Sequence, residues 1–302
     1  MSDPEEPNRV IDVAAWSAKA RANPAAYESR QLTEVFLTAL SFAPSFREQL
    51  YLKGGILMAL AYGSPRSTSD VDMTAVADPA ETAAALRQEL DRALQRATAA
   101  LGLPDLLCRV QTAKLRPRPE TFEDAQNPSL RLTIAAARRG SADAAQLEAG
   151  SASRVLRVDI TFKEPVGSFQ ILGIGSGERR IRAYSLTDLV AEKLRALLQQ
   201  PVRDRYRRQD VYDIVLLVRR FDFDADERAA ILRALHEKAA ARSLPVVRTG
   251  MANPEVAARA RADWPTLAQE LDGPLPDFGE WFGVVRDFYE DLPWQSDEAS
   301  FR

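Results

Sequence analysis

The chain has 302 residues, which at about 150 residues per domain corresponds to one large or two modest domains with a sizeable core. Apolar residues make up 46% and charged residues 27% of the chain, with 18 Pro and 14 Gly, and this composition excludes disordered, collagen-like and coiled-coil classes. The formal net charge of −3 excludes a uniformly basic protein that wraps nucleic acid, but local basic patches remain possible.

Membrane, export and disulfide signals are not expected from this sequence. The longest apolar run, residues 56–62, is far shorter than the ~18 residues that a membrane span needs, and the first ten residues are acidic and polar. One cysteine, Cys108, and one histidine, His236, cannot supply an intrachain disulfide or a Cys/His zinc site. We therefore expect a cytoplasmic protein whose metal ions would have oxygen ligands.

The N-terminal third mixes helical and strand patterns. After about ten residues without a pattern, the sequence predicts two packing helices, a short strand, a short helix, a loop rich in Gly, Ser and Pro, and a second strand ending near residue 76. A long Ala/Leu/Arg helix follows and ends at Gly102.

From about residue 105 to residue 183 the hydrophobic period changes to two, which predicts a sheet. Ser185 then begins a helix, and the chain has helical periodicity from there onward. We therefore predict an α+β fold with two domains, a mixed-sheet domain with N-terminal helices at 1–183 and an all-helical domain at 184–302.

Acidic side chains gather on the polar faces of two predicted strands. Because side chains alternate along a strand, Asp70 and Asp72 share one face with Thr74, and Asp159 lies on the polar face of the strand at 154–166. Three such carboxylates repel one another unless cations neutralise them, and oxygen ligands suit Mg²⁺ or Mn²⁺. A lone Asp-x-Asp pair is more often a solvated strand end than a metal site, so this pattern alone does not establish a metal site.

Two glycines add context to the acids. Gly54 and Gly55 precede them and open the short helix, where backbone N–H groups can approach the phosphates of a nucleotide. The alternative is a tight turn that needs no ligand.

The motifs together resemble a known family. The segment YLKGGILMALAYGSPRSTSDVDMTA at 51–75 resembles the first motif of polymerase-beta-type nucleotidyltransferases, and specifically of the AbiEii-type toxins of type IV toxin–antitoxin systems. Three later segments, DITF around Asp159, LTDLVAEKLRAL at 186–197 and RRQDVYDIVLL at 207–217, resemble further motifs of that family in the same order. The resemblance implies a polymerase-beta-like mixed sheet with flanking helices.

The resemblance also implies roles for individual residues. Asp70 and Asp72 would hold the catalytic metal ion with Asp159 as the third acid, Lys193 would grip the phosphates of the nucleotide, and Asp210 would complete the site. The helical pattern places Lys193 at the edge of an apolar stripe, where a surface lysine is the alternative reading. Asp210 could instead favour the helix dipole.

Other polar residues near these motifs have two readings each. Arg66 could contact the triphosphate or merely order its loop. Thr68 corresponds to a hydroxyl that is phosphorylated in relatives to silence the toxin, or is an ordinary loop residue. Asp213, on the same helical face as Asp210, could pair with a nearby arginine.

A short basic run lies between the Lys193 helix and the Asp210 helix. It contains four arginines, Arg203, Arg205, Arg207 and Arg208. These arginines could bind the phosphates of a nucleic-acid acceptor or form a solvated loop face.

The leading hypothesis is a toxin that transfers a nucleoside monophosphate from an NTP to the 3′ end of tRNA, releases pyrophosphate and blocks translation. The expected cofactor is Mg²⁺ or Mn²⁺, and the expected partners are the acceptor end of tRNA and a cognate antitoxin encoded nearby, without membrane or DNA. One alternative keeps the enzyme but changes the acceptor to a protein hydroxyl or a small molecule. Another is a nucleotide-binding or interaction module without catalysis, against which the intact acids argue.

Overall fold

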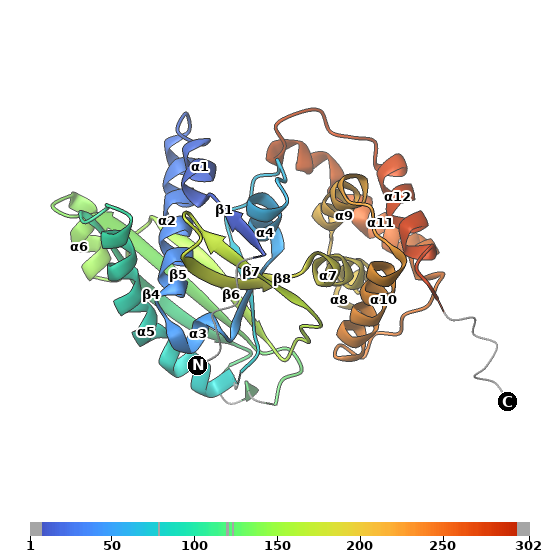
Figure 1. Ribbon diagram of the computed structural model, residues 1–302, viewed down its shortest axis with the longest axis horizontal. Helices are drawn as coiled ribbons and strands as arrows, with labels where there is room; N and C mark the ends of the chain where they lie inside the picture. Colours follow the sequence, from blue (N-terminus) through green and yellow to red (C-terminus); the bar gives the residue numbers. More distant parts are fainter. Residues whose placement is uncertain (1–7, 78, 119–120, 123, 295–302) are drawn as a thin grey trace. The chain divides into compact units, whose positions relative to one another are not determined.

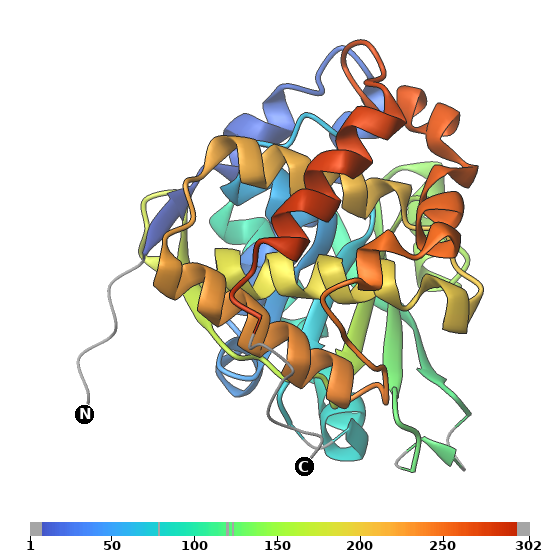
Figure 2. The same cartoon turned by 90° about the vertical axis from the view of Figure 1, so that its right-hand side faces the viewer.

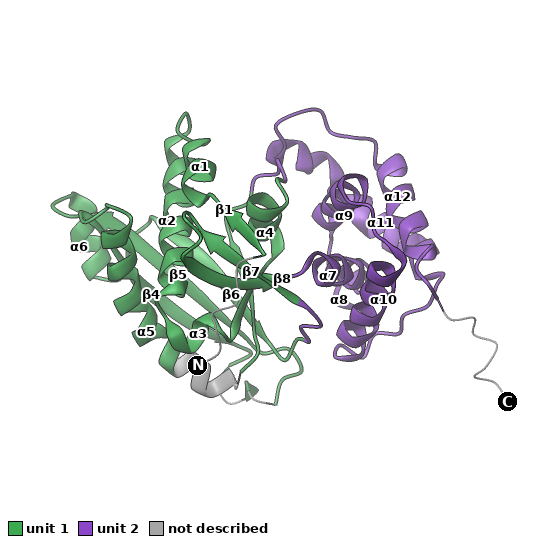
Figure 3. Ribbon diagram, viewed as in Figure 1, with its two compact units in different colours: residues 1–63, 68–164, 169–184 green, residues 64–67, 165–168, 185–302 purple. Residues whose placement is uncertain are grey.

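A computed structural model describes the backbone of residues 8–77, 79–118, 121–122 and 124–294. Its contacts divide the chain into two compact units (Figure 3). The first, here called the sheet unit, contains residues 1–63, 68–164 and 169–184. The second, the helical unit, contains residues 64–67, 165–168 and 185–302.

In the described residues, eight strands form one mixed sheet in the order β1-β7-β8-β2-β3-β6-β5-β4 (Figure 1). The strands are β1 (Arg9–Ile11), β2 (Leu50–Lys53), β3 (Val71–Ala75), β4 (Leu106–Arg116), β5 (Ser129–Arg138), β6 (Val155–Phe162), β7 (Phe169–Ile174) and β8 (Arg179–Tyr184). The β3–β6 pair at the centre is parallel, and both its outer neighbours, β2 and β5, pair with it in the antiparallel sense.

The sheet unit also contains helices, which pack against this sheet and against one another. They are α1 (Val13–Ala18), α2 (Pro24–Ser41), α3 (Pro44–Arg47), α4 (Gly54–Ala61), α5 (Pro79–Ala100) and α6 (Ala142–Glu148). Helix α2 begins where Asn23 accepts a hydrogen bond from the Ala26 backbone N–H and Pro24 occupies the first turn. The apolar residues of its second half, Val35 and Phe36 among them, are buried and form part of the core of the unit.

Register explains why one face of the sheet is apolar and the other polar. Leu52, Met73, Ile160 and Leu130 face one another across four strands and are all buried. Since side chains alternate along a strand, the next residue on each strand must point to the other face. The predicted alternation of β3 and β6 is therefore confirmed.

The helical unit begins at Ser185, whose hydroxyl accepts a hydrogen bond from the Asp188 backbone N–H at 3.1 Å. Its elements are α7 (Leu186–Leu198), α8 (Gln200–Arg203), α9 (Arg208–Arg220), α10 (Ala225–Ala240), α11 (Pro254–Ala262), α12 (Phe278–Glu290) and two 3₁₀ helices, η2 (Gly250–Ala252) and η3 (Trp264–Glu270). Helix α12, red in Figure 2, packs against α9, where Tyr212 stacks on Trp281 with 4.8 Å between ring centroids. The aromatic residues of α12 therefore serve packing.

The fold agrees with the predicted α+β class, a mixed sheet with flanking helices followed by a helical region. Two elements differ from the sequence prediction. The stretch expected to lack structure contains β1, which pairs with β7 through backbone hydrogen bonds, and α6 interrupts the predicted run of strands. Cys108 is buried and His236 is exposed. Among the described helices, none has the length and apolar character to span a membrane.

Candidate active site

A row of charged residues crosses the polar face of the sheet. Lys53, Asp72, Asp159 and Arg131 are consecutive register partners on β2, β3, β6 and β5. Residues directly opposite each other share a face and lie about 5 Å apart between neighbouring strands. The sheet therefore brings two of the three predicted acids together and places a cation at each end of the pair. We call these four residues the charged row.

Arg131 binds Asp159 in a bidentate ion pair. Arg131 donates from Nε to Oδ1 at 2.6 Å and from Nη2 to Oδ2 at 2.8 Å, so both carboxylate oxygens are engaged. The hydrogen bond to Asp159 raises the pKa of Arg131, and the nearby charge of Asp70 acts in the same direction. The two side chains remain 34% and 29% exposed, respectively, so the pair lies in reach of solvent.

Asp70 immediately precedes β3 and is half-buried. With Asp72 it offers two carboxylates two residues apart. Among the described residues, however, no group of three or more His, Cys, Asp or Glu side chains is arranged to hold a metal ion. Asp159 binds Arg131, and the role of the three acids as metal ligands stays a prediction.

Gly54 makes room for Asp72. Its φ is +68°, in the left-handed region, and a Cβ at this position would collide with the Asp72 carboxylate. This close approach, at the first residue of α4, explains why the turn needs glycine. Gly55 follows in the same first turn. The proposed contact of both glycines with a nucleotide stays a prediction.

Lys53 is a residue that sequence reasoning missed. It is buried, and its Nζ donates to Glu164 Oε2 at 2.6 Å and to Thr161 Oγ1 at 2.9 Å. The Thr74 hydroxyl lies 2.7 Å from the Tyr184 hydroxyl beneath the charged row. These buried polar contacts fix the strands that carry the acids, because each buried charge has a hydrogen-bonded partner.

Lys193 lies at the centre of a buried ion network in the helical unit. It is only 5% exposed, and its Nζ donates to Asp213 Oδ2 at 2.7 Å and to Asp210 Oδ1 at 3.1 Å. Burial acts to lower the pKa of Lys193, but the two carboxylates outweigh it and the pKa is raised. The surface-lysine reading is therefore wrong, and Asp213 is as buried as the apolar residues of α9.

Arg66 also belongs to this network. It lies in the short segment 64–67, which packs with the helical unit. Its Nε and Nη2 donate to the two oxygens of Asp213 at 3.3 and 3.2 Å, and its Nη1 donates to Glu270 Oε2 at 3.1 Å. The Ser67 N–H also donates to the Glu270 carbonyl oxygen at 2.7 Å. These contacts favour the loop-ordering reading of Arg66. Glu270, at the end of η3, carried no signal in the sequence.

The basic run between α7 and α9 separates into two parts. Arg208 donates to Glu270 Oε1 at 2.8 Å and so belongs to the network. The other three, which we call the arginine segment, are exposed: Arg203, Arg205 and Arg207. Asp204 among them accepts a hydrogen bond from Arg259 at 2.6 Å instead. Burial and then the nearby charges of Arg195, Arg205 and Arg207 lower the pKa of Arg203.

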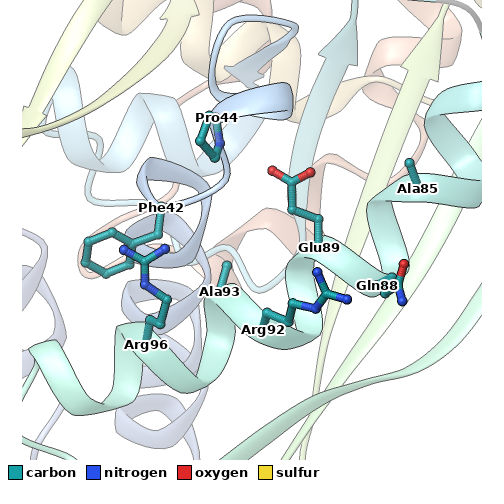
Figure 4. A pocket seen from close by; sticks show the side chains of 8 residues that line it. All are labelled: Phe42, Pro44, Ala85, Gln88, Glu89, Arg92, Ala93 and Arg96. Carbon is teal, nitrogen blue, oxygen red and sulfur yellow. The ribbon is translucent and has the colours of Figure 1, made fainter.

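Thr68 and the described cavity add little to either group. Thr68 is half-buried in the loop before β3. A cavity of about 320 Å³ lies in the sheet unit between the end of α2 and α5, lined by Phe42, Glu89 and Arg96 among others (Figure 4). It contains none of the predicted site residues. The candidate residues thus fall into two separate groups, the charged row in the sheet unit and the Lys193 network in the helical unit.

Comparisons with known proteins bear on these two groups. The sequence pattern described as "Nucleotidyl transferase AbiEii toxin, Type IV TA system" matches residues 35–294. MenT4, a nucleotidyltransferase toxin from Mycobacterium tuberculosis, has a similar structure, with a TM-score of 0.58 and 18% identity over 94% of this chain and 90% of that one. JHP933 from Helicobacter pylori gives 0.48 and 14% over 86% and 90%. A search of curated proteins finds no match.

The fold is therefore that of a nucleotidyltransferase. The match covers most of the chain, and the protein belongs to the AbiEii nucleotidyltransferase toxin family of type IV toxin–antitoxin systems. Membership of this family implies a cognate antitoxin.

Proposed function

We propose that this protein transfers a nucleoside monophosphate from an NTP to the 3′ end of tRNA, releases pyrophosphate and thereby blocks translation. The observation that carries the proposal is a pair of acids, Asp70 immediately before β3 and Asp72 on its polar face, with Gly54 leaving room for the Asp72 carboxylate. The tRNA acceptor follows from the family resemblance. These substrates place the reaction in the cytoplasm, and the cognate antitoxin is the expected protein partner.

Two carboxylates fit one Mg²⁺ or Mn²⁺ ion, because Mg²⁺ is commonly bound by one or two carboxylates and completes its shell with water and substrate phosphates. Asp70 and Asp72 would hold this ion. When bound, it would stabilise negative charge on the reacting phosphate.

The chain's own residues have distinct roles in the proposed transfer. The ribose hydroxyl oxygen of the acceptor bonds to the α-phosphorus of the NTP, the bond to pyrophosphate breaks, and the hydroxyl releases its proton. Lys193 orients the pyrophosphate, and Asp210 and Asp213 hold the ammonium in place. The arginine segment offsets the repulsion between the acids and a polyanionic acceptor.

The test uses each of the four NTPs labelled at the α-phosphate, incubated separately with total RNA and with lysate protein. We expect label in the tRNA fraction and none in protein. Label in protein or in small molecules alone would transfer the proposal to the alternative acceptor class, and no label in any fraction would contradict transferase activity.

The matched variants are Asp72→Ala and Asp143→Ala. Asp72→Ala abolishes labelling with the fold intact by circular dichroism, because the Asp72 side chain is partly exposed and lies outside the apolar core. Asp143, an exposed acid on α6, controls for the loss of one charge in the same unit. Near-normal labelling by Asp72→Ala would show that this acid is not part of the reaction.

A further inference from the structure

The charged row contains as many cations as acids, but one of the cations also binds an acid outside the row. It contains two acids, Asp72 and Asp159, flanked by Lys53 and Arg131, and the ammonium of Lys53 is used by Glu164. Two carboxylates on adjacent strands destabilise the sheet unless a cation lies near them. In this sheet Arg131 supplies a cation for Asp159 within the fold itself.

The geometry of that contact commits Asp159 to Arg131. A guanidinium edge matches a carboxylate with two parallel N–H···O bonds, and here both are short. A divalent ion bound to the same oxygens would stand beside the guanidinium charge and be repelled by it. Asp159 therefore makes a poor ligand for a second metal ion, in agreement with the lack of a three-acid cluster among the described residues.

Arg131 can donate further hydrogen bonds besides the two that it makes to Asp159. It uses Nε and Nη2 on Asp159, while Nη1 has no hydrogen-bond partner among the described residues, and the side chain is one-third exposed. The charge of Asp70 acts on Arg131, so the guanidinium lies within the electrostatic reach of the acid pair on β3. A cation with free donors beside an acid pair can contact a phosphate oxygen.

We propose that Arg131 serves in place of a second metal ion: Asp159 positions Arg131, Arg131 contacts the phosphates of the NTP, and Asp70 and Asp72 hold a single divalent ion. This inference rests on the nucleotidyl-transfer function proposed above. Asp159 is then a positioning residue and not a metal ligand.

The test counts ions. Electron paramagnetic resonance gives the number of Mn²⁺ ions bound per protein in the presence of a saturating NTP analogue whose α,β-bridge is methylene, and calorimetry gives the affinity of the analogue. We expect one ion for the wild type, one for Asp159→Asn and none at the protein carboxylates for Asp72→Asn. Two ions for the wild type, with one lost in Asp159→Asn, would overturn the inference.

The affinity of the analogue tests the role of Arg131 directly. Arg131→Gln weakens it by about ten- to a hundred-fold, as loss of a charge-assisted hydrogen bond to phosphate does, and Arg131→Lys restores part of it. If Asp159 acts only through Arg131, Asp159→Asn adds no further loss to Arg131→Gln. Unchanged affinity in Arg131→Gln, or additive losses in the double variant, would contradict the proposal.

The control is Arg138→Gln, which removes one exposed positive charge from the same strand but on the opposite face of the sheet. It leaves ion number and affinity unchanged within about twofold. Failures of the two proposals are distinguishable: two bound ions with intact transfer refute only this inference, whereas no bound ion and no transfer refute the proposed function with it.

Discussion

The buried network around Asp213 makes a sharp prediction about stability. Asp213 is fully buried between Lys193 and Arg66, and Asp213→Asn removes its charge while keeping its shape. Removing one partner of a buried ion pair costs about 3–5 kcal/mol, since the other charge is left uncompensated. Each cation keeps a second carboxylate at 3.1 Å, Asp210 for Lys193 and Glu270 for Arg66. We therefore expect the lower end, about 3 kcal/mol.

The assay is chemical and thermal unfolding at neutral pH, followed by circular dichroism. A loss of about 3 kcal/mol lowers the Tm by about 6–12 °C if 2–4 °C correspond to 1 kcal/mol in a chain of this size class. The control, Asp287→Asn, neutralises an exposed acid paired with Arg286 and changes stability by less than about 1 kcal/mol. A loss below about 1 kcal/mol in Asp213→Asn would refute the reasoning.

The pH dependence supplies a second check on Asp213. Burial raises the pKa of this carboxyl, but Lys193 and Arg66 outweigh it, so the folded pKa lies below its usual value. Its stabilisation is then present above the unfolded pKa of about 4 and is lost as the pH falls through the lower folded pKa. The difference in stability between wild type and Asp213→Asn must therefore narrow as the pH falls below the unfolded pKa of about 4. A constant difference would contradict the ion-pair account.

Three further predictions concern the site. Gly54→Ala displaces Asp72 and lowers the stability more than Gly102→Ala does. Gly102 has a similar positive φ but no neighbour within 4 Å of an added Cβ, and its replacement is expected to cost about 1–2 kcal/mol. Equal losses of Tm in the two variants would show that the close approach of Gly54 and Asp72 does not matter for stability. Lys193→Ala lowers kcat and raises KM for the NTP together, and normal kinetics would remove it from the mechanism. Replacing the arginine segment by Ala flattens the log–log salt dependence of single-stranded acceptor binding by about two units, at ~0.7 per phosphate contact, and leaves NTP binding unchanged; equal salt slopes would place the acceptor elsewhere.

The fold could be predicted where local patterns are strong. The alternation around Asp159 and the cap at Ser185 are local properties of a few consecutive residues, and both hold in the structure. Strand β1 has only three residues and is stabilised by backbone pairing with β7, so its side chains carried no usable period. Helix α6 is similarly short, with one buried residue, Leu147.

The partners of the site residues could not be predicted, because they depend on contacts between distant segments. Arg131 meets Asp159 only through the register of β5 on β6, and Glu270 lies 204 residues from Arg66. The burial of Lys193 was missed for the same reason. Its helix alone places it at the edge of an apolar stripe, and the two carboxylates that compensate its charge come from another helix, α9.

The helical unit is assembled from three separate stretches of chain, and this has a consequence for dissecting the protein. A fragment that starts at residue 184 leaves behind Arg66, whose guanidinium holds Asp213, and Pro165, whose carbonyl oxygen accepts a hydrogen bond from the buried Lys238 at 2.6 Å. In such a fragment the buried Asp213 and the buried Lys238 would each lose one of their hydrogen-bond partners. Truncation and domain-exchange experiments should therefore keep 64–67 and 165–168 with the helices, since the linear order of this chain does not coincide with its two compact units.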